Sequence, residues 1–182
     1  MTQPIGLASL FAPPAAGFEQ PFEMLAACHE RMQRMLALLA RLRTHLASHR
    51  ADPQAQQAAR DVMRYFDQAA PQHHRDEELH VFPPLLAAGD PPLVAIVQRL
   101  LREHARMQER WPPARAVLLG IAEGALPALA TDDDAALDAF AALYEEHLRA
   151  EDAIAYPAAQ SLLDPQAQHA MGEEMMRRRG VK

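Results

Sequence analysis

Residues 73–83 read HHRDEELHVFP, and residues 147–157 read HLRAEDAIAYP. Both stretches hold a His, a Glu four residues later, and an aromatic residue followed by Pro, at an offset of 74 residues. A second pair of matching stretches lies upstream, HERMQ at 29–33 and HARMQ at 104–108, at an offset of 75 residues. The chain therefore contains an internal repeat. Each half is predicted to be a helical hairpin with one His on its first helix and His-x-x-x-Glu on its second.

Two such hairpins predict an all-α fold, an up-down antiparallel four-helix bundle with a short C-terminal helix. Apolar residues recur at spacings of three, four and seven, as expected for amphipathic helices. Prolines and capping residues suggest the boundaries. The first expected helix spans about 21–50, and the second spans 53–82 and ends at Pro83-Pro84. The third starts at Pro91 and is stopped or kinked by Pro112-Pro113, with a shorter helical piece in 114–130. The fourth is capped by Thr131 or Asp132 and ends at Pro157, and the fifth runs from Pro165 to Gly180. The expected divisions are a loosely ordered leader (1–20), the bundle (21–160) and a helical tail (161–182).

Composition narrows the function classes. The formal net charge of -6 disfavours nucleic acid as a partner. No uncharged apolar run is long enough to cross a bilayer, so no membrane partner is expected. The single cysteine, Cys28, cannot form an internal disulfide. Because the N-terminal residues also lack the pattern of a secretory signal, we expect a cytoplasmic protein.

The repeated His and Glu residues are predicted to meet at one level of the bundle. The four His residues lie eight to thirteen residues from proline-marked helix ends, which places them roughly 12–20 Å from the same end. Repeated packing alone would favour Leu or Ala, since burying a polar side chain without a partner is costly. The predicted metal ligands are His29, His73, Glu77, His104, His147 and Glu151.

Four imidazoles and two carboxylates are a suitable donor set for a two-metal centre. Neutral imidazole binds iron, copper, nickel or zinc, and carboxylate adds hard, anionic character. Glu77 and Glu151 come from opposing helices and could bridge two ions about 3.5–4 Å apart. Such a site would keep positions open for O2, NO or peroxide, whereas a structural zinc site would be closed and tetrahedral.

The register of the second helix has an alternative, because His74 and Glu78 are also four residues apart. The repeat favours His73 and Glu77, whose distances from the aromatic-Pro pair equal those in the second half. His80 could lie just outside the site or at a helix edge. His45, His49 and His169 are predicted to be surface residues, since helix geometry places them away from the site.

These residues resemble the hemerythrin-like HHE cation-binding family. The resemblance covers about residues 21–160 and is carried by His29, His104 and the two motifs at 73–83 and 147–157. It implies a di-iron centre, two non-haem iron ions with an oxo or hydroxo bridge, inside an up-down bundle. Members of the family bind O2, sense oxygen or iron, handle NO, or supply iron to damaged iron–sulfur proteins.

Two positions depart from the oxygen-carrying members of that family. Those members place a second His four residues after the third-helix His, where this chain has Gln108. They also end in His-x-x-x-x-Asp, which His147 and Asp152 match, although Glu151 fits the internal repeat better. The pattern is more similar to the four-His, two-Glu branch that repairs iron centres.

The leading hypothesis is a di-iron protein that binds or responds to O2 or NO, or supplies iron, under oxidative or nitrosative stress. A di-iron oxidase or peroxidase is an alternative, but ferritin-like oxidases use Glu-x-x-His rather than His-x-x-x-Glu. A metal-free helical interaction protein is a further alternative. The sequence leaves open whether the protein is an enzyme, which small ligand it takes, and its oligomeric state.

Overall fold

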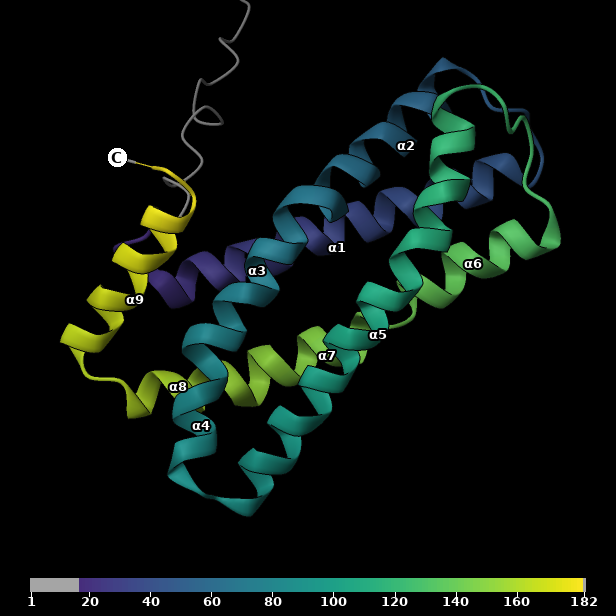
Figure 1. Ribbon diagram of the computed structural model, residues 1–182. Coiled ribbons are helices and arrows are strands. Elements are labelled where there is room, and N and C mark those ends of the chain that lie inside the picture. The colour runs from purple at the N-terminus through teal and green to yellow at the C-terminus, as the bar shows by residue number, and fades with distance from the viewer. Residues whose placement is uncertain (1–16, 182) are drawn as a thin grey trace, which may run out of the picture.

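The computed structural model describes residues 17–181, and every regular element in that range is a helix (Figure 1). The predicted all-α class is therefore confirmed for the described residues. Of the predicted leader, residues 1–16 lie outside the described range. The helices are α1 (Pro21–Leu46), α2 (Pro53–Arg64), η1 (Tyr65–Ala69), α3 (Ala70–Asp76), η2 (Glu77–Val81), α4 (Phe82–Ala88), α5 (Pro91–Ala122), α6 (Thr131–Ala141), α7 (Glu145–Ala150), η3 (Glu151–Ala155), α8 (Tyr156–Leu162) and α9 (Pro165–Arg178).

Helices α2 to α4 form one uninterrupted helical run, so the prediction that Pro83-Pro84 ends the second helix was wrong. The run continues to Ala88 and stops at Gly89, which adopts the left-handed φ of 70° that glycine tolerates. The start was predicted correctly, because the Asp52 carboxylate accepts a hydrogen bond from the backbone N–H of Ala55.

Three wider π-helical turns, η1, η2 and η3, explain how prolines fit inside these runs. Pro71, Pro83 and Pro157 each lie two residues after the end of one such turn. Proline has no N–H, and its ring clashes with the carbonyl four residues earlier. A turn with i→i+5 hydrogen bonds moves that carbonyl away, and such turns often occur at functional sites. The helix therefore continues past each proline.

Helix α5 is also longer than predicted. It runs through Pro112 and Pro113 without ending, and residues 114–122 continue it instead of forming a separate piece. Ala114, Leu118 and Ile121 lie beyond the prolines and are fully buried. This half of α5 packs against α2 and α6. Such packing stabilises a helix where the local sequence, here two prolines, disfavours one.

The fourth predicted helix is interrupted at residues 142–144 and continues past Pro157 to Leu162, so both its continuity and its end were predicted incorrectly. Its N-cap is Ala130, not Thr131 or Asp132. The Asp133 carboxylate accepts a hydrogen bond from the Ala130 N–H, which replaces the expected cap.

Two apolar clusters form the core, and a polar layer separates them along each helical run. One cluster contains Met32, Leu39, Phe66, Leu118 and Phe140 among its members. The other contains Phe22, Leu25, Phe82, Leu100 and Tyr156 among its members. The buried His and Glu residues lie near the boundary between these two sets on each helical run, so apolar side chains pack on both sides of the polar layer.

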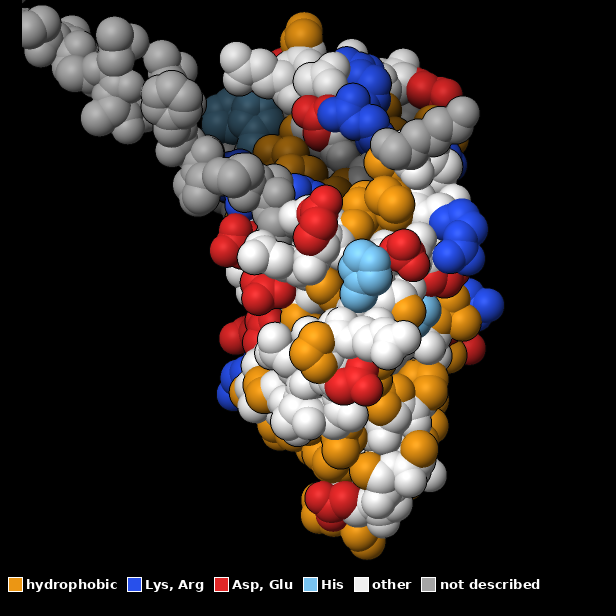
Figure 2. Space-filling model, turned by 90° about the vertical axis from the view of Figure 1, so that its left-hand side faces the viewer, with side chains coloured by type: hydrophobic (Ala, Val, Ile, Leu, Met, Phe, Trp, Pro, Cys, Tyr) orange, Lys and Arg blue, Asp and Glu red, His pale blue; other side chains and the backbone are white. Residues whose placement is uncertain are grey.

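The tail helix α9 packs against the rest of the molecule through Met171 and Met175, which belong to the second apolar cluster. Its end holds the fully buried Asp76 carboxylate: Arg178 Nη2 lies 2.5 Å from Asp76 Oδ1, and Arg179 Nη2 lies 2.5 Å from Asp76 Oδ2. The tail thereby neutralises a carboxylate on the helix that carries His73. On the α9 side of the molecule, hydrophobic side chains lie scattered between charged ones (Figure 2).

None of the helices within residues 17–181 combines the length and the apolar character that crossing a lipid bilayer requires.

The ion pairs of Asp76 with the tail helix predict that two tail arginines contribute strongly to the free energy of unfolding. Replacing Arg178 and Arg179 together by Ala would leave a buried carboxylate without a cation, which typically costs about 3 kcal/mol or more. Chemical denaturation should show this loss. The exposed neighbour Arg177→Ala is the control and should change stability by less than about 0.5 kcal/mol. Equal values for the double variant and the control would contradict the assignment.

Candidate metal centre

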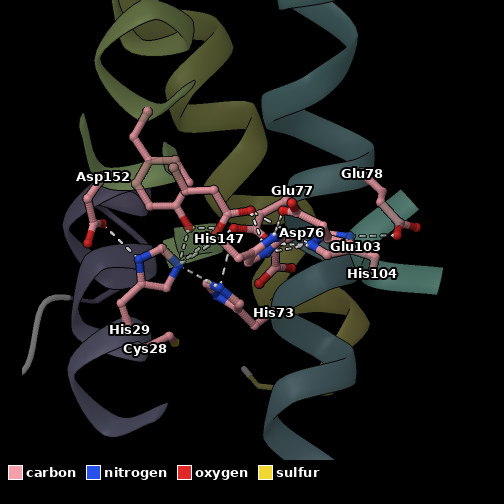
Figure 3. A network of polar contacts seen from close by, with 12 residues as sticks. Cys28, His29, His73, Asp76, Glu77, Glu78, Glu103, His104, His147 and Asp152 are labelled. Carbon is pink, nitrogen blue, oxygen red and sulfur yellow. Dashed lines mark hydrogen bonds and ion pairs between the residues drawn. The ribbon is translucent and has the colours of Figure 1, made fainter. Parts of the chain in front are cut away.

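The four predicted His residues meet in two pairs inside the polar layer (Figure 3). His29 on α1 faces His73 on α3, with their Nε2 atoms 2.9 Å apart. His104 on α5 faces His147 on α7, with their Nε2 atoms 3.2 Å apart. Two nitrogens bound at right angles to one ion, each at about 2.1 Å, would be about 3.0 Å apart. Both pairs therefore have the separation of two ligands on one ion.

Glu77, the first residue of η2, lies between the two His pairs and is completely buried. Its Oε1 atom is 3.3 Å from His73 Nε2 and 3.7 Å from His29 Nε2. Its Oε2 atom is 3.4 Å from His104 Nε2. The carboxylate thus presents one oxygen to each pair.

Glu151, the first residue of η3, has the same arrangement and is also completely buried. Its Oε2 atom is 3.3 Å from His29 Nε2. Its Oε1 atom is 3.0 Å from His147 Nε2 and 3.7 Å from His104 Nε2. The structure therefore brings all six predicted residues together, with two carboxylates between two imidazole pairs.

An outer ring of carboxylates holds three of the imidazoles by their Nδ1 atoms. A hydrogen bond of this kind orients the ring and leaves Nε2 free to bind an ion. The pairs are Asp152 with His29 at 2.7 Å, Glu78 with His104 at 3.0 Å, and Glu103 with His147 at 2.9 Å.

Two of these outer carboxylates follow the internal repeat. Glu78 comes directly after Glu77 and contacts His104 of the second half. Asp152 comes directly after Glu151 and contacts His29 of the first half. Each half therefore orients a His of the other half. The acidic pairs in the two motifs were the sequence signal for this role, but their partners depend on the packing of the halves.

His74 is a candidate ligand that the preferred register omitted. It is 6% exposed, and its ring stacks on that of His104 with centroids 4.1 Å apart. Donor atoms of His74, His104 and His147 all lie within 4.8 Å of one another, as do those of His29, His73, Glu77 and Glu151. Neighbouring residues on a helix differ by about 100° in direction. His73 and His74 can therefore serve opposite His pairs, and the two registers are not exclusive.

Tyr156 adds a hydroxyl on the opposite side of the cluster. Its Oη donates a hydrogen bond of 2.5 Å to Glu77 Oε1 and lies 2.9 Å from His29 Nε2. Tyr156 stacks on His29, and the repeat-related Phe82 lies in a tilted contact with His104. The sequence marked both only as aromatic-Pro positions. The hydroxyl on one side and His74 on the other make the two halves chemically unequal.

The charges of the cluster compensate one another. Burial opposes the protonated form of His29, but Asp152, Glu151 and Glu77 outweigh it and raise the pKa of His29 to about 11. Burial likewise opposes protonated His104, and its carboxylate neighbours raise the pKa of His104 to about 11. Burial would raise the pKa of Glu77, yet the surrounding histidines hold that pKa well below its usual range. A metal cation would therefore have to displace protons from the imidazoles.

Several buried polar atoms of the cluster have no hydrogen-bond partner among the described residues. They are Glu77 Oε2, both carboxylate oxygens of Glu151, His73 Nδ1 and His74 Nε2. Buried polar atoms without partners are rare and costly. A cation can satisfy carboxylate oxygens and imidazole nitrogens at the same time, so the residues present fit a metal centre.

The remaining histidines lie apart from this cluster. His45 and His49 stack on each other at the end of α1, and His45 lies 3.2 Å from the Asp52 carboxylate. His169 is exposed on α9. His80 lies 2.7 Å from Glu174 and so contacts the tail helix instead of a ligand.

Comparison with known proteins identifies the family of the chain. The hemerythrin HHE cation-binding domain matches residues 20–159, and the chain belongs to that family. A Haemophilus influenzae (strain ATCC 51907 / DSM 11121 / KW20 / Rd) protein described as uncharacterized is 28% identical over 167 residues, which cover 92% of this chain and 94% of that protein. The family thus indicates metal binding, with iron as the expected metal, by a helical chain whose buried His/Glu cluster could hold it.

The outer carboxylates predict an effect on metal affinity without loss of a ligand. Asp152→Asn keeps the size of the side chain but weakens its hold on the His29 imidazole. Loss of such a partner typically lowers metal affinity about 10–100-fold. Anaerobic competition for ferrous iron with a chelator would measure it. The control is Glu146→Gln, an exposed residue on α7. Affinity equal to the control would show that Asp152 does not support the site.

Proposed function

We propose that the protein holds two iron ions, one between each His pair, with Glu77 and Glu151 bridging them. The observation that supports this most directly is that each buried carboxylate presents one oxygen to each pair. Carboxylates can bridge metals about 3.5–4 Å apart. The proposed set is His29 and His73 on one ion, and His104, His147 and His74 on the other.

The donor set favours iron over a structural zinc site. Structural zinc is tetrahedral and closed, usually with cysteine among its ligands, and this cluster contains none. Imidazole and carboxylate together suit iron. When bound, a pair of iron ions would supply redox chemistry with O2 or NO, at positions that the protein ligands do not fill and where an oxo or hydroxo bridge can also bind.

Gln108 and His74 bear on whether the proposed iron centre would store O2 or react with O2 or NO. Gln108 is exposed, so the position where oxygen carriers have a His ligand contributes nothing to the cluster. His74 lies on that side too, but it comes from another helix and stacks on His104, so the donors there are arranged differently from those of the oxygen carriers. We propose that the protein reacts with O2 or NO, or releases iron, under oxidative or nitrosative stress, and does not store O2.

The finer architecture belongs to the same proposal. The four helical runs α1, α2–α4, α5 and α6–α8 would form the up-down antiparallel bundle of residues 21–160, with 161–182 as a helical tail. Successive contacts of α1 with α2, α2 with α5, and α5 with α6 support this order. The single cysteine supports a reducing, cytoplasmic location.

Metal content tests the proposal. The chain purified from iron-supplied cells should contain about two iron ions, as expected for a carboxylate-bridged pair. Glu77→Ala and Glu151→Ala should each lose most of the iron, because each removes a donor to both ions. His74→Ala should lose about half, since it serves one ion. Elemental analysis measures all three. The control His49→Ala should keep its iron, and one tightly bound zinc without iron would refute the di-iron assignment.

Reactivity tests the choice between storage and reaction. The reduced iron-loaded protein should be oxidised by air without returning to the ferrous state when O2 is removed, and ferrous protein should bind NO. Stopped-flow absorbance of reduced protein mixed with O2, followed by deoxygenation, would measure this. Complete recovery of the ferrous spectrum over repeated cycles would instead identify an oxygen carrier.

A further inference from the structure

An open cavity of about 260 Å³ lies between α3 and α5 and reaches the polar layer at His74. Its inner walls are buried side chains, including Phe66, Met107 and Phe140. The cavity lies on the His104 side of the cluster, because His74 stacks on His104. It is therefore a route from the surface to one half of the candidate metal centre.

The walls are mainly aromatic and are held in place by their neighbours. Ring centroids of Phe66 lie 5.4 Å from Trp111 and 5.0 Å from Phe140, and those of Trp111 and Phe140 lie 4.9 Å apart. The Trp111 indole N–H donates a 2.9 Å hydrogen bond to Asp67, which fixes the ring at the cavity wall. Aromatic rings attract one another in edge-to-face or offset arrangements. The rings of the wall could therefore make such contacts with an aromatic ring bound in the cavity.

The polar groups of the cavity are few and nearly balanced in charge. Arg75 and Gln108 are exposed at its mouth, and Glu78 beside them is already paired with His104. Inside, His74 Nε2 makes no hydrogen bond to any described residue, and the Tyr144 side chain also lines the cavity. One cation balanced by one anion favours an uncharged ligand, and the inner polar groups favour one that carries a hydrogen-bonding substituent.

We propose that this cavity binds a small, uncharged, single-ring aromatic molecule with one polar substituent, such as a phenol. An apolar cavity of about 150 Å³ is enough to hold benzene, so the observed volume accommodates a substituted ring. A conduit for O2 or NO alone would not need this volume or the aromatic walls. The aromatic walls of the cavity do not depend on the proposed di-iron function. His74 Nε2 is free to contact the ligand only when it does not bind iron, so the test uses metal-free protein.

The single tryptophan of the chain, Trp111, reports occupancy of the cavity. The full-length protein, stripped of metal with a chelator, would be titrated with 4-fluorophenol. Binding would be followed by broadening of the fluorine NMR line and by the change in Trp111 fluorescence. Both signals should saturate together. Failure to saturate would overturn the proposal, as would binding that appears only after iron is restored, which would indicate coordination to the metal alone.

Two pairs of variants locate the bound molecule. Ala70 is buried in the cavity wall, whereas the neighbouring Ala69 is exposed and outside it. Ala70→Phe should fill the cavity and weaken binding at least about tenfold, equal to about 1.4 kcal/mol. Ala69→Phe should bind normally. If Ala70→Phe does not fold, Gln108→Phe at the mouth, compared with the exposed control Glu109→Phe, decides. Unchanged affinity in the cavity variants that fold would place the molecule elsewhere and overturn the proposal.

Discussion

Two ionisable carboxylates, Glu77 and Glu151, lie fully buried between two hydrocarbon clusters, and much of the structure compensates for that burial. Moving a carboxylate from water into an apolar interior costs several kcal/mol unless opposite charges and hydrogen bonds replace the lost hydration. The four imidazoles supply that replacement, which requires their helices to keep the same depth. A slip of one turn, about 5.4 Å, on any helix would separate the pairs. Register between the helices is therefore set by the polar layer as well as by the apolar core.

Acidic and basic side chains alternate from the centre of this polar layer outward. Inner carboxylates contact imidazoles, and imidazoles contact outer carboxylates such as Asp152 and Glu103. Asp76, on the same helix as His73, is in turn neutralised by two arginines of α9. Removing one layer of such an alternation leaves the next without its partner. The tail thus belongs electrostatically to the site, although the ion pairs of α9 are made with Asp76 and His80 and not with the six predicted ligands.

The internal repeat predicted the six central residues because depth along a helix depends only on residue counts, and those counts survive local irregularities. It could not predict how the helices pass Pro83 and Pro157, because that depends on π-helical turns whose stability comes from packing. The repeat also favoured the register of His73 over that of His74, which remained an alternative. The position that matches His74 in the second half is Leu148, so the repeat could not support a candidate ligand that occurs in one half alone. The role of the Tyr156 hydroxyl was not predicted for the same reason, because the matching residue in the first half is Phe82, which has no hydroxyl.

The exchange of outer carboxylates between halves has an evolutionary consequence. A single hairpin would carry His29, His73 and Glu77, but its Glu78 would have no partner within the same hairpin. Two identical hairpins related by a twofold axis would complete each other, since such an interface is self-complementary. Duplication and fusion of one ancestral segment would thus give a complete centre from the start. In a symmetric dimer every substitution appears in both copies. Once the copies are fused, each can change alone, and Tyr156 opposite Phe82 and His74 opposite Leu148 are differences of this kind.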